Sequence, residues 1–260
     1  MIDLADTYVS GMPNSQNVLD IFKDEWSSRL PDEFGLTTTP GTARLFEDGR
    51  VEWAREMFGE FSDWSVLELG PLEGGHSYML QRAGAGKVIS VEANRRAFLK
   101  CLCMKEVLDL GKVRFLLGDF IPFLEQSKTR YDLTFASGVL YHMEEPWRLL
   151  QGIANVSDRM FLWTHYYDEA IIRGNPALAG KFSDTELMEF GGCSYECSIQ
   201  SYQDALEWSG FCGGPKRVSR WLTRASLMDA IKRFGFNNIE VNFDHSNHPN
   251  GPALAVCASK

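Results

Sequence analysis

A strand, a glycine-rich turn and the start of a helix follow one another between Val66 and His76. The apolar run carries Glu68 near its end, and glycines at 70, 74 and 75 precede an amphipathic segment at 77–83. About twenty residues later the apolar segment 87–91 ends in Glu92. Such a loop lets backbone N–H groups approach a ligand closely, and an acid after the second strand can accept hydrogen bonds from ribose hydroxyls. The pattern predicts a site for a nucleoside cofactor.

Strand-like and helical segments alternate from residue 65 onward. The pattern predicts strands at 65–69, 87–91, 113–117, 131–136, 159–164, 239–243 and 253–258, and helices at 77–83, 95–110, 122–126, 145–154 and 226–234. This alternation favours a parallel sheet with helices on both faces. The segment joining the last two strands is too short for a crossover helix, so these strands should form an antiparallel hairpin.

The remaining segments divide the chain into regions. Residues 1–62 are expected to form an N-terminal helical cap, with helices at 18–29 and 43–61. Residues 63–260 form the main domain, in which the strand–helix rhythm breaks between about 167 and 221. Long stretches without such rhythm are usually functional, so we expect a substrate lid there, with one helix near 202–209.

Composition limits the possible partners and locations. The net charge of −9 opposes a broad polyanion-binding surface. The chain contains no apolar run of membrane-spanning length and does not begin like a signal peptide, so a cytoplasmic location is expected. Cys193, Cys197 and Cys212 lack CxxC spacing and a nearby histidine, so no metal site is expected.

The chain resembles the class I S-adenosylmethionine-dependent methyltransferases over roughly residues 65–260. The resemblance rests on Glu68-Leu69-Gly70 with Gly74 and Gly75, on Glu92, on Gly118-Asp119-Phe120, and on the segment 135–142. It implies a Rossmann-like α/β fold with a mostly parallel seven-stranded sheet and an antiparallel C-terminal hairpin. It also implies S-adenosylmethionine as the cofactor.

The same resemblance assigns roles around that cofactor. Glu68 would face the methionine ammonium group, Glu92 the ribose hydroxyls and Asp119 the adenine amino group. The implied cofactor-binding residues are Glu68, Gly70, Pro71, Gly74, His76, Glu92, Ala93, Asp119, Phe120, Ser137, Gly138 and Tyr141. One residue departs from the family pattern: Leu72 stands where the loop usually has its middle glycine, which predicts a different loop path.

Candidate residues for the chemistry lie after the fourth and fifth strands of the main domain. His142 and His165 occupy these positions, and with Tyr166 they form the expected catalytic set. The expected substrate-binding residues are Tyr141, Tyr167, Arg220 and Trp221. Arg220 belongs to a basic cluster at 216–224 that reads either as an anion clamp or as a solvated face. The histidines of the hairpin loop, at 245 and 248, are expected to face solvent.

We expect methyl transfer to oxygen or nitrogen of a small-molecule acceptor, and nucleic acid is not the expected partner. The segment 138–142 also resembles the tRNA wobble-uridine carboxymethyltransferases, whose Tyr-His pair helps to hold the carboxylate of carboxy-S-adenosylmethionine. Tyr141-His142 matches that pair, so tRNA modification is an alternative. An NAD-dependent oxidoreductase and a catalytically silent S-adenosylmethionine-binding protein are further alternatives. An exposed aromatic lid or cap is a candidate homodimer surface.

Overall fold

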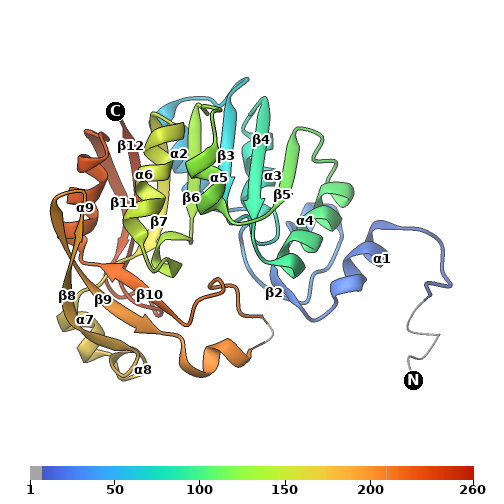
Figure 1. Ribbon diagram of the computed structural model, residues 1–260. Coiled ribbons are helices and arrows are strands. Elements are labelled where there is room, and N and C mark those ends of the chain that lie inside the picture. The colour runs from blue at the N-terminus through green and yellow to red at the C-terminus, as the bar shows by residue number, and fades with distance from the viewer. Residues whose placement is uncertain (1–7, 209) are drawn as a thin grey trace.

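A seven-stranded sheet forms the centre of the molecule (Figure 1). The structure, a computed structural model, describes residues 8–208 and 210–260. The strand order is β11-β12-β7-β6-β3-β4-β5. The strands are β3 (Ser65–Leu69), β4 (Lys87–Glu92), β5 (Val113–Leu117), β6 (Leu133–Ser137), β7 (Arg159–His165), β11 (Asn238–His245) and β12 (Ala253–Ser259). Strands β3 to β7 run parallel, whereas β12 runs antiparallel to both β7 and β11. The expected fold class is confirmed.

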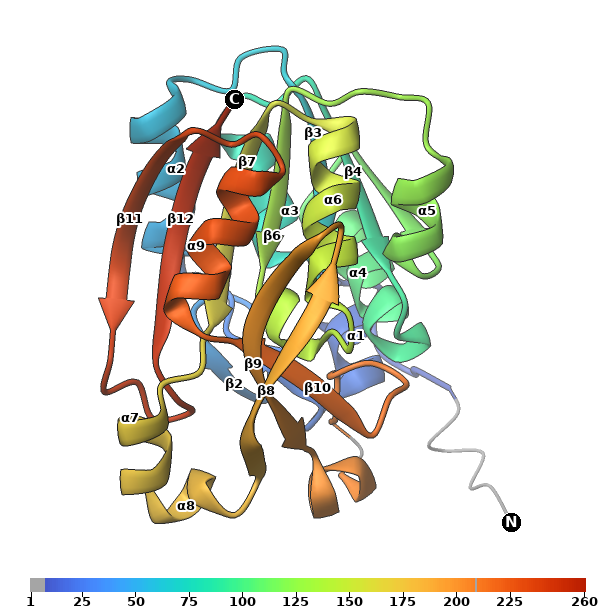
Figure 2. The ribbon, with the colours of Figure 1, turned by 60° about the vertical axis from the view of Figure 1, so that its left-hand side comes forward.

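Helices cover both faces of this sheet (Figure 2). Helices α2 (Gly49–Phe58), α3 (Gly75–Arg82) and α4 (Arg95–Val107) share one apolar core with the sheet, and α5 (Phe120–Gln126), α6 (Pro146–Val156) and α9 (Arg224–Arg233) share the other. The alternation along β7 shows why two cores form: Phe161 belongs to the first, and Met160 and Leu162 belong to the second. Because both faces are buried, the strands are apolar along most of their length.

The N-terminal region is less helical than expected. The predicted helix at 18–29 is replaced by α1 (Ser15–Leu19), a 3-10 turn at Asp20–Phe22 and the strand β1 (Trp26–Ser28). Strand β1 pairs in parallel with β2 (Pro40–Ala43). The predicted helix at 43–61 shortens to α2 because Asp48 caps its first turn and Gly59, at φ +87°, ends it. Residues 1–7 of the expected cap lie outside the described residues.

The expected lid contains a β-sheet that its sequence did not reveal. After α7 (Glu169–Gly174) and α8 (Pro176–Ala179), the strands β8 (Phe182–Phe190), β9 (Cys193–Ser201) and β10 (Val218–Leu222) form an antiparallel sheet. This sheet lies below the carboxyl ends of the central strands (Figures 1 and 2). The helix expected near 202–209 is a 3-10 turn at Gln203–Glu207, and Ser209 lies outside the described residues.

Membrane-spanning helices are not found in the described ranges, where every helix is too short or too polar to cross a bilayer.

Candidate active site

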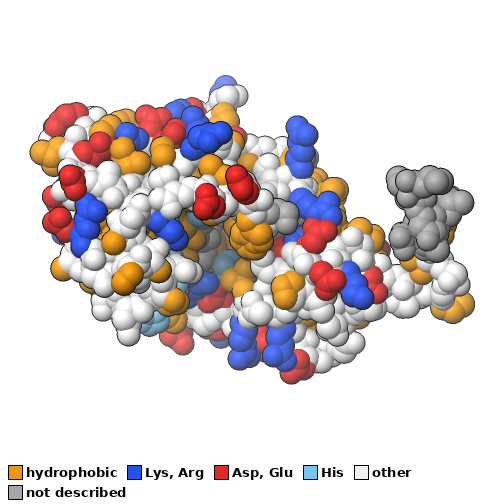
Figure 3. Space-filling model, turned by 90° about the horizontal axis from the view of Figure 1, so that it is seen from below, with side chains coloured by type: hydrophobic (Ala, Val, Ile, Leu, Met, Phe, Trp, Pro, Cys, Tyr) orange, Lys and Arg blue, Asp and Glu red, His pale blue; other side chains and the backbone are white. Residues whose placement is uncertain are grey.

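The candidate site lies at the carboxyl ends of β3, β4, β6 and β7, where open α/β sheets bind their ligands. Figure 3 views this edge from below and shows a hollow there with histidine side chains around it. A separate hollow of about 820 Å³ opens between residues 29–33, α2 and α3. None of the residues expected to bind cofactor or acceptor lines that second hollow. Charged side chains of its lining pair with each other, as Arg44 does with Glu47 at 3.0 Å.

The loop between β3 and α3 keeps a left-handed backbone at three positions. Gly70 has φ +68°, and a Cβ there would lie 2.5 Å from Cγ1 of Val139, so this position admits only glycine. Gly74 has φ +82° and precedes α3. Leu72 has φ +55°, so the chain keeps at this position a conformation that glycine adopts with little strain.

Two buried carboxylates border this loop. Glu68 is 1% exposed, and its Oε2 accepts hydrogen bonds from the hydroxyls of Ser77 and Ser90, the latter at 2.6 Å. Its Oε1 is buried and has no hydrogen-bond partner among the described residues. Burial raises the pKa of Glu68. Glu92 accepts from the backbone N–H groups of Leu72 at 3.1 Å and Asn94 at 2.8 Å, and burial also raises its pKa.

The remaining residues of the implied cofactor site lie at the same sheet edge. Asp119 is exposed after β5, and its Oδ1 accepts from the N–H of Ile121 at 2.8 Å, which caps α5. Gly138 has φ +82° just beyond β6, and its N–H donates to the carbonyl of Trp163 at 2.9 Å. Pro71 and Ala93 lie in the loops after β3 and β4, Phe120 is the first residue of α5, and Ser137 ends β6.

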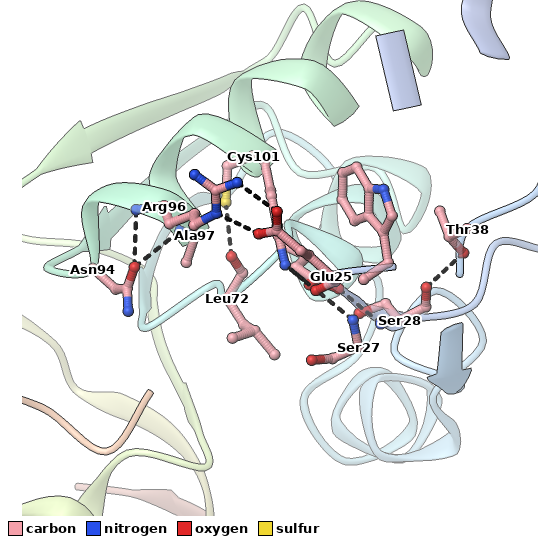
Figure 4. Close-up of polar contacts among 12 residues, drawn as sticks. Glu25, Ser27, Ser28, Thr38, Leu72, Asn94, Arg96, Ala97 and Cys101 are labelled. Atoms are coloured by element: carbon pink, nitrogen blue, oxygen red, sulfur yellow. Dashed lines mark hydrogen bonds and ion pairs between the residues drawn. The ribbon is translucent and has the colours of Figure 1, made fainter. Parts of the chain in front are cut away.

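The N-terminal segment anchors the back of the loop, which the sequence did not predict. The carboxylate of Glu73 accepts from the N–H groups of Ser27 at 3.0 Å and Ser28 at 2.7 Å. It also receives a hydrogen bond from Lys100 of α4 at 2.9 Å. Figure 4 shows the neighbouring contact, in which Glu25 pairs with Arg96 at the start of α4. The acidic residue inside the glycine-rich turn, Glu73, was the sequence signal for its contacts with Ser27 and Ser28.

His165 ends β7 at the same edge of the sheet. Its Nδ1 lies 2.9 Å from the carbonyl oxygen of Gly251. A carbonyl oxygen can only accept, so Nδ1 carries the proton in the neutral ring and Nε2 is left as an acceptor. Burial lowers the pKa of His165 to about 4, and the charges of His248 and Arg50 act in the same direction. The imidazole is therefore neutral at physiological pH.

Aromatic residues surround that imidazole. The ring of Tyr141 lies edge-on to His165 with centroids 4.6 Å apart, and burial raises the pKa of Tyr141, so its phenol stays protonated. His142 connects the site to the lid, because its Nδ1 lies 2.8 Å from the hydroxyl oxygen of Tyr202. Burial lowers the pKa of His142 to about 4 and raises the pKa of Tyr202 to about 12. Both groups are uncharged at neutral pH.

Two residues of the expected catalytic and cofactor sets face elsewhere. The hydroxyl of Tyr166 lies 3.3 Å from Oδ1 of Asp244 on β11, so we do not assign Tyr166 to the reaction. His76 points its Nε2 to Asp48 at 2.8 Å, and its ring lies against Phe135. His76 therefore holds Asp48 at the start of α2.

The expected substrate residues of the lid are mostly buried or paired within the protein. Nε of Arg220 donates to Glu186 at 2.8 Å and its Nη1 to the carbonyl of Glu144 at 2.8 Å. Tyr167 is buried in the lid core. Trp221 is also buried, and its indole lies 4.9 Å from His165 in a stacked arrangement.

Two residues near His165 were not among the site residues expected from the sequence: Arg50 and His248. Arg50, in the first turn of α2, lies with its guanidinium carbon 4.5 Å from the ring centroid of Trp163. His248, expected to face solvent, lies with its ring centroid 5.0 Å from that of His165. The hairpin gave the available signal, because β12 runs antiparallel to β7 and its preceding turn must therefore lie at the carboxyl end of β7.

No family model matches the chain. Among curated proteins, it is 28% identical over 114 residues to a tRNA U34 carboxymethyltransferase of Campylobacter hominis. That match covers 43% of this chain and 39% of the relative, or about two fifths of the relative's length.

Solved structures agree over more of the chain. The N-terminal domain of EvdMO1, determined in the presence of SAH and D-fucose, matches with a TM-score of 0.68 and 24% identity, over 97% of this chain and 99% of that domain. The chain described here therefore has the class I methyltransferase fold. An S-adenosylmethionine-dependent methyltransferase from Mesorhizobium loti matches with a TM-score of 0.55 and 16% identity, over 83% of this chain and 100% of that chain. The resemblance read from the sequence is confirmed at the level of the fold.

The longer EvdMO1 structure gives a TM-score of 0.58 and 21% identity, over 94% of this chain. This chain spans only 46% of that longer protein. The class I methyltransferase fold thus corresponds to one part of that relative. In this fold the sheet edge described above is the place where the strands end and ligands bind.

Proposed function

We propose that the protein is an S-adenosylmethionine-dependent methyltransferase that acts on a hydroxyl group of a small molecule. The buried Oε1 of Glu68 carries the cofactor assignment. It has no hydrogen-bond partner among the residues that the structure describes, and a buried carboxylate oxygen without a donor is costly unless a ligand supplies one. Glu68 would receive the ammonium group of the cofactor. Glu92 would receive its ribose hydroxyls, and Asp119 its adenine amino group.

His165 supports transfer to oxygen. When bound, S-adenosylmethionine supplies a methyl group that its cationic sulfonium activates for displacement. An acceptor hydroxyl must lose its proton as the new bond to carbon forms, and Nε2 of His165 is an unprotonated acceptor at neutral pH. Tyr141, packed edge-on against His165, would help to position the acceptor. The D-fucose present with the EvdMO1 domain is a hydroxyl-rich small molecule, which also favours this class of acceptor.

A turnover assay tests this proposal. The protein is incubated with S-adenosylmethionine and either D-fucose or an amine of similar size, and S-adenosylhomocysteine and methylated product are measured by mass spectrometry. Product from the hydroxyl compound supports the proposal. Product from the amine alone would contradict oxygen as the acceptor atom.

Modification of tRNA is a second candidate, favoured by the match to the Campylobacter hominis enzyme and by the Tyr141-His142 pair. Competition between S-adenosylmethionine and carboxy-S-adenosylmethionine for the protein separates the two functions. A clear preference for the carboxylated compound would favour tRNA modification. Calorimetry separates both functions from an NAD-dependent oxidoreductase. Heat of binding with NAD, and no heat with S-adenosylmethionine or carboxy-S-adenosylmethionine, would favour an oxidoreductase.

A further inference from the structure

Arg50 is a cation fixed at the acceptor side of the site. Its side chain is 17% exposed and is held by Asp48, whose carboxylate accepts hydrogen bonds from Nε at 2.9 Å and from Nη2. The guanidinium lies over the ring of Trp163. The centroid of that ring lies 5.1 Å from His165 and 6.0 Å from both His248 and Tyr141, so Arg50 belongs to this cluster. Its Nη1 makes no hydrogen bond within the described residues, so these N–H groups remain for a ligand.

His248 supplies a second donor beside it. Its Nδ1 accepts from the backbone N–H of Asn250 at 3.2 Å, so the proton of the neutral ring is on Nε2. His165 has the opposite arrangement, with its proton on Nδ1 and an acceptor at Nε2. The two imidazoles lie with centroids 5.0 Å apart. The site therefore combines one acceptor, at His165, with donors at His248 and Arg50.

The charge around Arg50 is already balanced. Asp48 pairs with the guanidinium on one side and with Nε2 of His76 on the other, at 2.8 Å. An Arg–Asp pair has no net charge, so its remaining N–H groups suit a neutral oxygen better than a carboxylate, which would lose its hydration without gaining a free cation.

We propose that Arg50 determines acceptor specificity, and that the acceptor is a neutral compound with two neighbouring hydroxyls, as in a sugar. One hydroxyl donates to Nε2 of His165 and is the methylation site. The oxygen beside it accepts from Nη1 of Arg50, and Nε2 of His248 donates to the same group. This inference rests on the proposed function, because it names the acceptor of that reaction.

Binding to the protein saturated with S-adenosylhomocysteine tests the inference separately from turnover. Saturation-transfer NMR measures the binding of five compounds: D-galactose, D-glucose, glycerol, cyclohexanol and D-galacturonate. Each compound is tested with wild type, Arg50→Gln, Arg50→Lys and Arg55→Gln. Arg55 lies on the same helix but pairs with Glu52 at its surface, so it is the matched control. We expect at least one vicinal diol to bind wild type and Arg55→Gln. The same diol should bind Arg50→Gln with at least about 10-fold lower affinity. Arg50→Lys should be intermediate because it keeps the charge and loses the fork.

Three results would overturn the inference: equal diol binding in Arg50→Gln and wild type, preference for cyclohexanol or D-galacturonate, or no binding of any of the three diols. A second pair of variants checks the donor role of His248. His248→Gln keeps an N–H donor and should bind the diol more tightly than His248→Ala, and equal binding by these two would remove His248 from the site. If wild type fails to bind S-adenosylhomocysteine, the proposed function itself fails, which is a separate outcome.

Discussion

The imidazole of His165 stacks on the indole of Trp221, with ring planes 6° apart and centroids 4.9 Å apart. His165 ends β7 of the central sheet, whereas Trp221 lies on β10 of the lid. The lid strand thus covers one face of the proposed base, while Gly251 holds its Nδ1. Sheet, lid and hairpin together fix the direction in which Nε2 points.

His165→Asn should abolish most turnover and spare cofactor binding. Asparagine keeps an N–H donor for the carbonyl of Gly251 but has no acceptor at the place of Nε2. Loss of a general base costs roughly 10²- to 10⁴-fold in rate. Turnover and S-adenosylhomocysteine affinity should be measured together, with the exposed His245→Asn as control. Wild-type turnover in His165→Asn would show that the reaction needs no base at this position.

His142 should make folding less favourable in acid. Its pKa is lowered to about 4, below the ordinary value of about 6.5, so its contribution to stability is present above pH 6.5 and is lost as the pH falls toward 4. Wild type alone does not isolate this effect, because the raised pKa values of Glu68 and Glu92 act with the opposite sign.

The comparison is therefore between wild type and His142→Gln, by denaturant unfolding at pH 7.5 and pH 4.5. The difference in the free energy of unfolding should move in favour of the variant by on the order of 1 kcal/mol or more at the lower pH. A difference that stays constant with pH would mean that His142 titrates normally in the folded protein.

Glu68→Gln should separate stability from binding. Burial raises the pKa of Glu68, so stability is lost as the pH rises from the unfolded-state pKa of about 4.5 to the higher folded-state pKa, and the loss persists at higher pH. The variant should be more stable than wild type at pH 7.5, and this gain should disappear below about pH 4.5. It should also bind S-adenosylhomocysteine about 10-fold more weakly. Unchanged affinity would remove Glu68 from the cofactor site; Glu47→Gln is the exposed control.

Leu72 should behave as a position that favours glycine. Its φ of +55° costs a side chain about 1 kcal/mol, so Leu72→Gly should be more stable than Leu72→Ala by on the order of that amount. At Leu99, an exposed position inside α4, the order should be reversed. Urea unfolding of the four variants measures both orders. A glycine variant less stable than the alanine variant at position 72 would contradict the left-handed loop.

Much of the fold followed from local patterns. The central strands are apolar and alternate with helices, and the short link before Ala253 predicted the antiparallel hairpin. The lid sheet was not predictable in this way. Strand β8 contains serine, aspartate and glutamate and few β-branched residues. It forms because it pairs with β9, which in turn pairs with β10. Strand β1 spans Trp26–Ser28 and depends on a partner at 40–43.

The candidate site was predictable where a residue ends a strand and obscure where it belongs to a cap or a loop. Glu68, Glu92 and His165 lie where the strand pattern placed them. Asp48 and Arg50 look like an ordinary helix start, since Asp48 does cap α2. Only the packing of α2 against the sheet brings Arg50 to Trp163.

Calorimetric titration with S-adenosylhomocysteine measures whether the protein has the proposed cofactor site. We expect micromolar binding to wild type and unchanged binding to Glu47→Gln. Binding to Glu92→Gln should be at least about 10-fold weaker, because the variant loses the charge that faces the ribose hydroxyls. Absence of binding to wild type, or equal binding to Glu92→Gln and wild type, would contradict the proposed cofactor site.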